Sequence, residues 1–209
     1  MKLYCVRHAE SVLNPGMRVH QTADTPLSEA GIKQAHLVAK RFANIPIDGI
    51  IASDYARAKH TAEIIHATVG KTIEFSPLLR ELKKPTALEG KDYDDPEIAH
   101  ILIEIANNKH NPHWKYSDGE SFSEFVRRGS AFLEMAGNRD EASLLIVSHG
   151  QFLNMVAALI TIGQDNLTPA LLDHFFHHTW MTNTGVTIFE QFEADRWCLL
   201  SWNDHSHLV

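Results

Sequence analysis

The sequence predicts an α/β fold, a three-layer sandwich in which a mainly parallel sheet lies between helices on both faces. Two observations predict it. Short apolar segments, typical of buried strands, alternate along the chain with amphipathic segments of helical period. Strands joined through a helix pair in parallel, because the helix returns the chain to the same end of the sheet. With 209 residues and 44% hydrophobic content, the chain suits one domain, residues 1–209, with a sizeable core.

Each predicted element carries a local signal. Strands are predicted at residues 2–6, 47–53, 72–76 and 143–148, followed by an antiparallel pair at 185–192 and 196–202. Helices are predicted at residues 28–44, 54–70, 96–107, 121–135, 151–162 and 171–180. Ser28 marks the start of the first helix and Gly70 the end of the second. Ser121 and Glu124 form a Ser-x-x-Glu capping box for the fourth.

Residues 83–118 interrupt this alternation. The segment holds three prolines and an acidic run, KDYDDPE, and it offers one amphipathic helix between two irregular stretches. We therefore interpret residues 83–118, with approximate bounds, as a small cap insertion that lies over the ends of the strands.

Composition and charge argue against several classes of protein. The net charge is 19 minus 26, or -7, without any block rich in Lys and Arg, which argues against nucleic acid as a partner. No apolar run approaches the ~18 residues of a membrane span, and the N-terminal residues lack a signal peptide. Cys5 and Cys198 fall in predicted strands and suit a reducing compartment as free thiols. We therefore expect a cytoplasmic protein with no membrane partner. The sequence does not indicate its oligomeric state.

Charged and nucleophilic side chains follow the predicted strands at their carboxyl ends. The first strand leads into Arg7 and His8, and the strand at residues 143–148 leads into His149. Arg57 lies in the first turn of the helix after the second strand, and Glu81 follows an apolar pair after the third. The carboxyl ends of parallel strands meet at one edge of a sheet, where ligands of α/β proteins bind. We therefore expect these side chains to form one site.

This set of side chains suits phosphoryl transfer. A phosphoryl group in transfer carries negative charge on three oxygens, so catalysis consists mostly of positioning and charge stabilisation. The planar guanidinium of arginine donates paired hydrogen bonds to such oxygens. A neutral imidazole is a good nucleophile near pH 7, and a carboxylic acid can protonate the departing alkoxide.

The sequence resembles the histidine phosphatase superfamily, in its phosphoglycerate-mutase-like branch. Matching pieces occur in order along residues 2–163, with a weaker match, NTGVTIFE, at residues 183–190. The pieces are RHAESVLN at 7–14, DTPLSEAG at 24–31, SDYARAKHTAEII at 53–65, LLRE at 78–81, GESFSEF at 119–125 and VSHG at 147–150. The resemblance implies a phosphatase that hydrolyses phosphate monoesters.

The resemblance also implies a role for each site residue. His8 would be the nucleophile that becomes phosphohistidine, and Glu81 would be the proton donor. Arg7, Arg57 and His149 would bind the phosphoryl oxygens. Four further residues are assigned to substrate binding: Asn14, His20, Gln21 and Gln151. A small phosphorylated molecule is the expected partner, and neither a cofactor nor a metal is implied.

The sequence departs from the family pattern at several positions. Ala9 replaces the glycine of the usual Arg-His-Gly, and we expect an ordinary φ there instead of the left-handed value that favours glycine. The glycine-tryptophan segment that often follows the asparagine is missing, and after Glu81 only Glu89 and Gly90 of the usual motif remain. Glu89 is an alternative proton donor. These departures keep every residue that the proposed chemistry needs. They leave the identity of the substrate undetermined.

Three other functions are considered. His174, His177 and His178 have helical spacing that can hold zinc in a metal hydrolase, although no matching cysteine or carboxylate pair lies nearby. The HSH sequence at residues 205–207 is interpreted as part of a mobile tail. A phosphoglycerate-type mutase is disfavoured, because the acidic insertion would repel a multiply anionic substrate. The third alternative is a regulator that binds a phosphate or a phosphoprotein without catalysing turnover. We favour the phosphatase.

Overall fold

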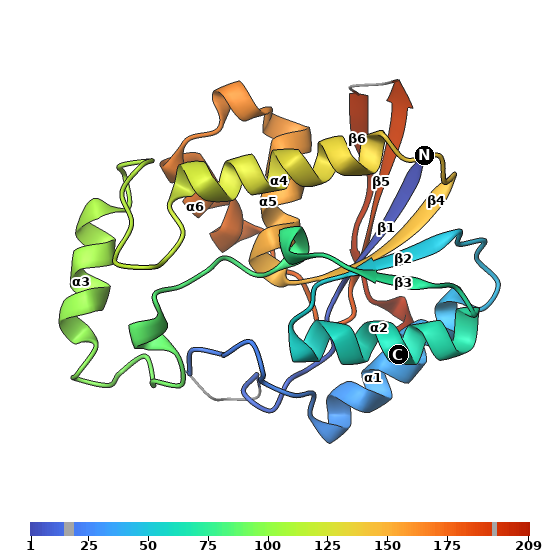
Figure 1. Cartoon of the computed structure of the whole chain (residues 1–209), viewed down its shortest axis with the longest axis horizontal. Coiled ribbons are helices and arrows are strands. Elements are labelled where there is room, and N and C mark those ends of the chain that lie inside the picture. Colours follow the sequence, from blue (N-terminus) through green and yellow to red (C-terminus); the bar gives the residue numbers. More distant parts are fainter. Residues whose placement is uncertain (15–18, 194–195) are drawn as a thin grey trace.

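The computed structural model describes residues 1–14, 19–193 and 196–209. Within these ranges the strands form one six-stranded sheet in the order β3-β2-β4-β1-β5-β6 (Figure 1). Their bounds are β1 Lys2–Arg7, β2 Gly49–Ala52, β3 Ile73–Phe75, β4 Ser143–Ser148, β5 Val186–Glu193 and β6 Arg196–Asp204. The first four strands pair in parallel, and β5 and β6 complete the sheet as antiparallel strands. β1, which leads into His8, therefore lies inside the sheet.

Helices cover both faces of the sheet (Figure 1). Their bounds are α1 Glu29–Phe42, α2 Ala56–Val69, α3 Ala99–Asn108, α4 Phe122–Gly137, α5 Gly150–Ile162 and α6 Pro169–His178. α1 and α2 pack on one face, and α4 and α5 pack on the other. The predicted three-layer α/β fold is therefore confirmed. None of the helices in the described ranges is long and apolar enough to span a membrane.

The core follows the alternation of side chains along the central strands. In β1, Leu3 and Cys5 pack in the cluster under α4 and α5, whereas Val6 packs in the cluster under α1 and α2. In β4, Ile146 belongs to the first cluster and Val147 to the second. Because both faces of these strands are buried, their sequences are continuous apolar runs.

Helix ends follow the predicted signals. Ser28 Oγ accepts the N–H of Gly31 at the start of α1, and Gly70 ends α2 with a left-handed φ of 70°. Ser121 and Glu124 form the predicted capping box at the start of α4, in which each side chain accepts the backbone N–H of the other residue. These bonds satisfy backbone groups that a helix end leaves without partners.

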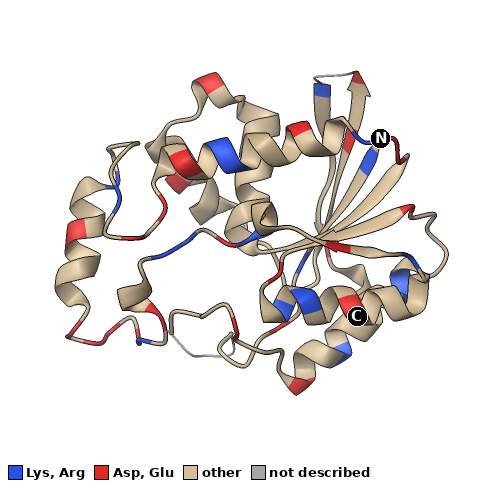
Figure 2. Ribbon diagram, in the orientation of Figure 1, with Lys and Arg blue, Asp and Glu red and all other residues tan. Residues whose placement is uncertain are grey.

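Residues 83–118 extend away from the sheet and carry α3 (Figure 1). A separate small cluster of buried residues, Leu88, Ile98 and Ile101, packs inside this segment. The acidic run lies in the loop that leads into α3 (Figure 2). The helix begins at residue 99, three residues later than predicted, because Ile98 closes a turn onto the carbonyl of Asp95.

The C-terminal residues pack against the domain, contrary to the expectation of a mobile tail. His207 Nε2 lies 3.0 Å from Thr184 Oγ1, and Arg41 on α1 donates to Asp204 Oδ2 at 2.6 Å. Thr184 has a positive φ of 59°, in the loop between α6 and β5. The end of the chain therefore supports that loop, in which the N–H of Thr184 donates to the carbonyl of Arg7 at the end of β1.

Candidate active site

The carboxyl ends of β1, β2 and β4 bring the predicted catalytic side chains together. The rings of His8 and His149, which follow β1 and β4, have centroids 5.1 Å apart. Arg57, in the first turn of α2, donates from Nε to His8 Nε2 at 3.2 Å. All three side chains are buried. Because hydrogen bonds are about 3 Å long, one phosphoryl group can contact all of them.

The His8 imidazole is held in one tautomer. Its Nδ1 lies 2.8 Å from the carbonyl oxygen of Ala9. A carbonyl only accepts, so the proton lies on Nδ1 and Nε2 keeps its lone pair. Burial, and then the charges of Arg57 and Arg7, hold the pKa of His8 well below its ordinary value. The ring is therefore neutral at pH 7, with the lone pair facing the other site residues.

The loop after β1 is anchored to α1 and α2. The N–H of Ala9 donates to Thr61 Oγ1 at 3.1 Å, and the N–H of Glu10 donates to Gln34 Oε1 at 2.9 Å. Gly31 packs so closely that a Cβ there would lie 2.0 Å from the carbonyl oxygen of Glu10, which only glycine avoids. Ala9 does not have a positive φ, which confirms the prediction made from the sequence.

Arg57 is buried and Arg7 is half-buried, and both have N–H donors to spare. Arg7 Nη1 donates to the carbonyl of Met181, and Arg7 Nε has no partner among the described residues. Arg57 Nη1 donates to the carbonyl of Thr22 at 2.9 Å. Burial lowers the pKa of both guanidinium groups, that of Arg57 to about 10, while the charge of Glu81 opposes the shift. Both arginines remain cationic at pH 7, which suits an anionic ligand.

His149 is held by Ser53, which follows β2. His149 Nε2 lies 2.8 Å from Ser53 Oγ, and its buried Nδ1 has no partner among the described residues. Burial and then the charge of Arg57 hold the pKa of His149 well below its ordinary value. The sequence pattern did not single out Ser53. The available signal was its position, because it ends a strand at the same edge of the sheet as His8.

Glu81 reaches the site from the segment after β3. Its Oε1 accepts the N–H groups of Leu82 and Phe152, both at 3.0 Å, and its Oε2 accepts the N–H of Gln151 at 3.2 Å. The last two donors belong to the first turn of α5, and a helix N-terminus attracts negative charge. The carboxylate is therefore fixed beside the two arginines, on which its charge acts.

Asn14 is connected to His8 through Asn183, a residue that the sequence analysis did not assign to the site. Asn14 Oδ1 accepts the N–H of Ser11 at 2.8 Å. Asn183 Nδ2 donates to the carbonyl oxygen of His8 at 2.9 Å and lies 3.5 Å from Asn14 Oδ1. Asn183 opens the weaker family match, NTGVTIFE, which was the available signal. With its oxygen engaged, Asn14 can offer its NH₂ group to a ligand.

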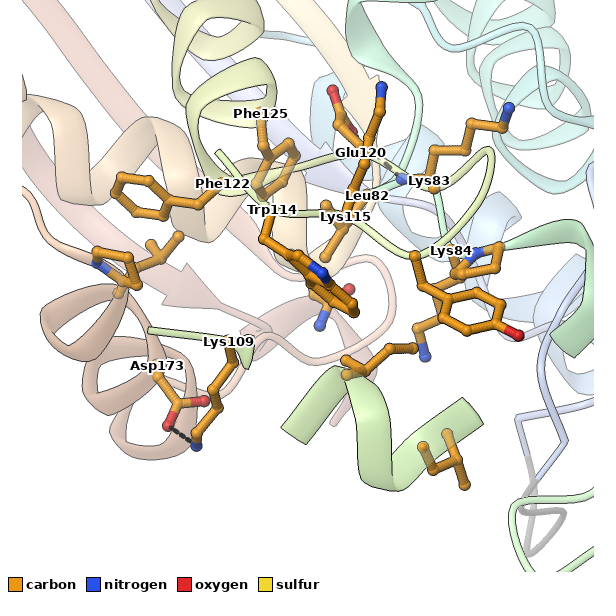
Figure 3. Close-up of a pocket in the computed structure, with 18 of the residues that line it drawn as sticks. Leu82, Lys83, Lys84, Lys109, Trp114, Lys115, Glu120, Phe122, Phe125 and Asp173 are labelled. Atoms are coloured by element: carbon orange, nitrogen blue, oxygen red, sulfur yellow. Dashed lines mark hydrogen bonds and ion pairs between the residues drawn. The ribbon is translucent and has the colours of Figure 1, made fainter. Parts of the chain in front are cut away.

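The other substrate-binding candidates lie further out. His20 and Gln151 both line a pocket of about 550 Å³ between the segment 83–118 and helices α5 and α6 (Figure 3). The ring of His20 stacks on Tyr93, with centroids 4.0 Å apart. Gln21 is half-buried and does not belong to the lining of this pocket. The structure thus brings two of these three residues to one cavity beside the predicted catalytic side chains.

The histidines of α6 contact the backbone of their own helix. His177 Nδ1 lies 2.6 Å from the carbonyl oxygen of Asp173, and His178 Nδ1 lies 2.8 Å from that of His174. The rings of His174 and His178 stack with centroids 4.0 Å apart. In the part of the chain that the structure describes, no group of three or more His, Cys, Asp or Glu side chains is placed to hold a metal ion.

Known proteins resemble this chain in sequence and in fold. "Probable phosphoglycerate mutase GpmB" of Yersinia pestis (strain Pestoides F) is 36% identical over 163 residues, which cover 77% of this chain and 74% of the relative. The structure of Bacillus stearothermophilus YhfR matches with a TM-score of 0.83 and 28% identity, over 100% of this chain and 99% of that chain. Phosphoserine phosphatase from Entamoeba histolytica, in complex with 3-phosphoglyceric acid, matches with a TM-score of 0.78 and 24% identity, over 100% and 99%.

The family model of the histidine phosphatase superfamily (branch 1) matches residues 3–205 of the chain. The match spans all strands of the sheet and the loops that carry the two histidines and two arginines. It agrees with the resemblance drawn from the sequence motifs. The chain belongs to branch 1 of the histidine phosphatase superfamily.

Proposed function

We propose that this protein hydrolyses phosphate monoesters through a phosphohistidine intermediate on His8. The observation that carries the proposal is the state of the His8 imidazole. Its Nδ1 faces the carbonyl of Ala9 at 2.8 Å, so Nε2 holds the lone pair, and Nε2 lies 3.2 Å from Arg57 Nε. A buried, neutral imidazole with its lone pair among cationic phosphate ligands is suited to attack phosphorus.

The phosphoryl oxygens would be bound by Arg7, Arg57 and His149. Arg7 Nε is a buried donor without a partner among the described residues. Ser53 would donate to His149 Nε2, which leaves the imidazole proton on the equally unpartnered Nδ1. Arg57 Nε would exchange its bond to His8 Nε2 for one to a phosphoryl oxygen when the substrate binds, which frees the nucleophile. The two arginines supply the positive charge that metal ions supply at other phosphoryl-transfer sites.

The reaction would take two steps. In the first, His8 Nε2 attacks phosphorus, the P–O ester bond breaks, and Glu81 gives its proton to the leaving oxygen, which releases the alcohol. In the second, water attacks phosphorus, the N–P bond breaks, and Glu81 accepts the proton of the water. Oε2 of Glu81 would hold this proton, because it accepts one N–H at 3.2 Å whereas Oε1 accepts two at 3.0 Å.

A phosphoglycerate-type mutase is the second candidate, because a relative carries that name. The sequence-based argument that the acidic run KDYDDPE would repel a multiply anionic substrate does not hold. Among the described residues, Tyr93 is the member of the acidic run that lines the pocket, where four lysines also lie. What favours hydrolysis is the largely aliphatic and aromatic wall of the pocket, which suits an apolar alcohol better than a small polyanionic acid. Residues 83–118 would act as the cap that provides this wall.

Trapping of the phosphoenzyme tests the proposed function. The protein is mixed with radiolabelled phenyl phosphate and quenched within milliseconds. We expect label on the protein that survives alkali and is lost in acid, as a phosphohistidine would be. His8→Ala should carry no label, and His60→Ala, an exposed position on α2, should be labelled like the unchanged protein. Turnover without any acid-labile label would overturn the mechanism.

Assays of binding and of product formation separate the alternatives. A silent regulator would bind vanadate but release no inorganic phosphate from any ester. A mutase would convert 3-phosphoglycerate into an isomeric ester instead of releasing phosphate. A metal hydrolase would lose turnover on treatment with a chelator and regain it with one divalent ion, whereas the proposed site should keep its full rate.

A further inference from the structure

The pocket beside the catalytic side chains has a specific position relative to Glu81. Leu82, the next residue in the chain, lines the pocket. Gln151 also lines it, and its N–H is bonded to Glu81 Oε2 at 3.2 Å. Glu81, as the proposed proton donor, must contact the leaving oxygen of the ester. Glu81 itself does not line this pocket, but Leu82 and Gln151 beside it do, so an alcohol attached to that oxygen can extend into it.

The walls of the pocket are mostly apolar. Leu102 and Ile105 come from α3, Trp114 from the loop after it, and Phe122 and Phe176 from α4 and α6. In Figure 3 the indole of Trp114 projects into the middle of the pocket, between Phe122 and Lys84. A pocket of about 550 Å³ is large enough for a ring system and lies within the range of small-molecule sites.

The charges in the lining are balanced, with one exception. Three of the four lysines that line the pocket are paired with carboxylates: Lys83 with Asp118 at 3.1 Å, Lys109 with Asp173 at 2.9 Å, and Lys115 with Glu124 at 2.7 Å. Lys84 Nζ instead contacts two neutral groups, the hydroxyl of Tyr93 at 2.9 Å and Nδ1 of His20 at 3.3 Å.

His20 does not balance the charge of Lys84. Burial and the nearby ammonium lower the pKa of His20 to about 4, so its ring is neutral at pH 7. An ammonium group has three donors and no acceptor, and two of its donors are directed at these neutral partners. Within the described residues, Lys84 is therefore the cation of the pocket without an anionic partner, and it is half-buried.

From the position of the pocket, its apolar walls and the charge of Lys84 we infer the class of the substrate. It is the phosphate ester of an alcohol that carries both an aromatic or bulky aliphatic group and a carboxylate. The apolar group packs against Trp114 and the side chains around it, and the carboxylate pairs with Lys84. This inference rests on the proposed function, because it places the alcohol from the role of Glu81.

Four matched esters test the inference. Propan-2-yl phosphate is the parent, 2-phosphooxypropanoate adds the carboxylate, 1-phenylpropan-2-yl phosphate adds the ring, and 3-phenyl-2-phosphooxypropanoate adds both. We expect kcat/KM to rise about tenfold or more with the ring, from apolar burial, and about fivefold with the carboxylate, the scale of a partly exposed ion pair. A fifth ester, 1-(4-carboxyphenyl)propan-2-yl phosphate, places the carboxylate at the far end of the ring. A carboxylate that gives no gain at either position would overturn the charged half of the inference.

Variants assign each gain to its residue. Lys84→Met should remove the gain from the carboxylate and keep the gain from the ring. Lys83→Met is the matched control, since that lysine already pairs with Asp118. Trp114→Ala should remove most of the gain from the ring, and Ile105→Trp, which fills the pocket from α3, should do so without creating a cavity. Ring gains that survive both pocket variants would overturn the apolar half.

Failure of the inference can be told from failure of the proposed function. Phosphoenzyme formation from phenyl phosphate reports on His8 and the groups proposed to bind the phosphoryl oxygens, and it needs neither the carboxylate nor Lys84. If the label forms but the matched esters show no gains, the substrate class is wrong and the phosphatase stands. If the label does not form with any ester, the proposed function is wrong.

Discussion

The end of the sheet that is proposed to bind phosphate and the segment 83–118 are built in opposite ways. At the sheet, buried polar groups from several strand ends hold one another in single orientations, as His149 is held by Ser53 and the backbone of His8 by Asn183. In the segment 83–118, a small cluster around Leu88 packs apart from the two larger clusters of the sheet, and ion pairs lie on the exposed surface.

The difference indicates a division of tasks. A phosphoryl group has the same shape and charge in every ester, so the groups that bind it can be rigid. The alcohol differs among esters, and loops on a rigid scaffold are where such differences are accommodated. Variants at the sheet should therefore reduce turnover of all esters alike, whereas variants of the pocket should change their ratios.

Arg57→Lys should give the largest effect among the variants considered below. Lysine keeps the charge but loses the planar pair of donors, and loss of one stabilising donor costs about 100-fold or more in rate. We expect this loss in kcat/KM for alkyl and aryl esters alike. Arg127→Lys, at an exposed position on α4, is the control. A loss that depends strongly on the alcohol would break the comparison between the two regions.

Glu81→Gln should separate leaving groups by their chemistry. It keeps the size of the side chain and removes the acid, so hydrolysis of alkyl esters should slow by about 100-fold. Nitrophenolate leaves without protonation, so the loss on the nitrophenyl ester should be much smaller when phosphoenzyme formation limits the rate. Both rates are measured with rapid-quench detection of the phosphoenzyme. Equal losses would remove Glu81 from this role and point to a carboxylate of the segment 83–118, such as Glu89.

Ser53→Ala should have an intermediate effect. It removes the partner of His149 Nε2, and one buried hydrogen bond contributes about 1 kcal/mol, or about fivefold in rate. We expect weaker vanadate binding and a lower kcat/KM for all esters. Ser53→Thr, which restores the hydroxyl, should recover part of the loss. If Ser53→Ala retained full vanadate affinity, the proton on His149 Nδ1 would not depend on Ser53.

The smallest expected effect concerns stability against acid. The pKa values of His20 and His207 are lowered to about 4, mainly by burial, so between pH 6.5 and 4 the unfolded chain binds more protons than the folded one. Their contribution to stability is complete above pH 6.5 and is lost as the pH falls toward 4. The free energy of unfolding, from urea titrations, should fall over this range and fall less steeply in His207→Gln. His36→Gln, exposed on α1, should leave the slope unchanged.

The sequence predicted the fold and the residues at the strand ends for one physical reason. A parallel sheet with helices on both faces brings the carboxyl end of each strand to one edge, so Arg7, His8 and His149 could be placed together before any coordinates. Ser53 obeys the same rule, and Asn183 reaches the same edge because it precedes β5, which runs antiparallel to β1. They were missed because serine and asparagine are common in turns, and their type alone does not indicate a contact with catalytic histidines.

The pocket could not be predicted in the same way. A segment outside the sheet has no strand register, so its sequence does not show which side chains face inward. The acidic run suggested a negatively charged cap, yet Lys91 pairs with Glu97 at the surface. The tail was expected to be mobile, although His207 packs on Thr184. In each case long-range packing decided the position, and composition alone carried no information about it.

The sheet order has a consequence for synthesis of the protein. β1 lies between β4 and β5, both of which are made much later in the chain. Asn183, which holds the backbone of His8, and His207, which supports the loop carrying Asn183, are made later still than β4. A ribosome-bound chain that ends before Asn183 therefore contains His8 but lacks a neighbouring strand and these contacts. The nascent chain should remain without activity until its C-terminal strands emerge, so that catalysis begins only when synthesis is nearly finished.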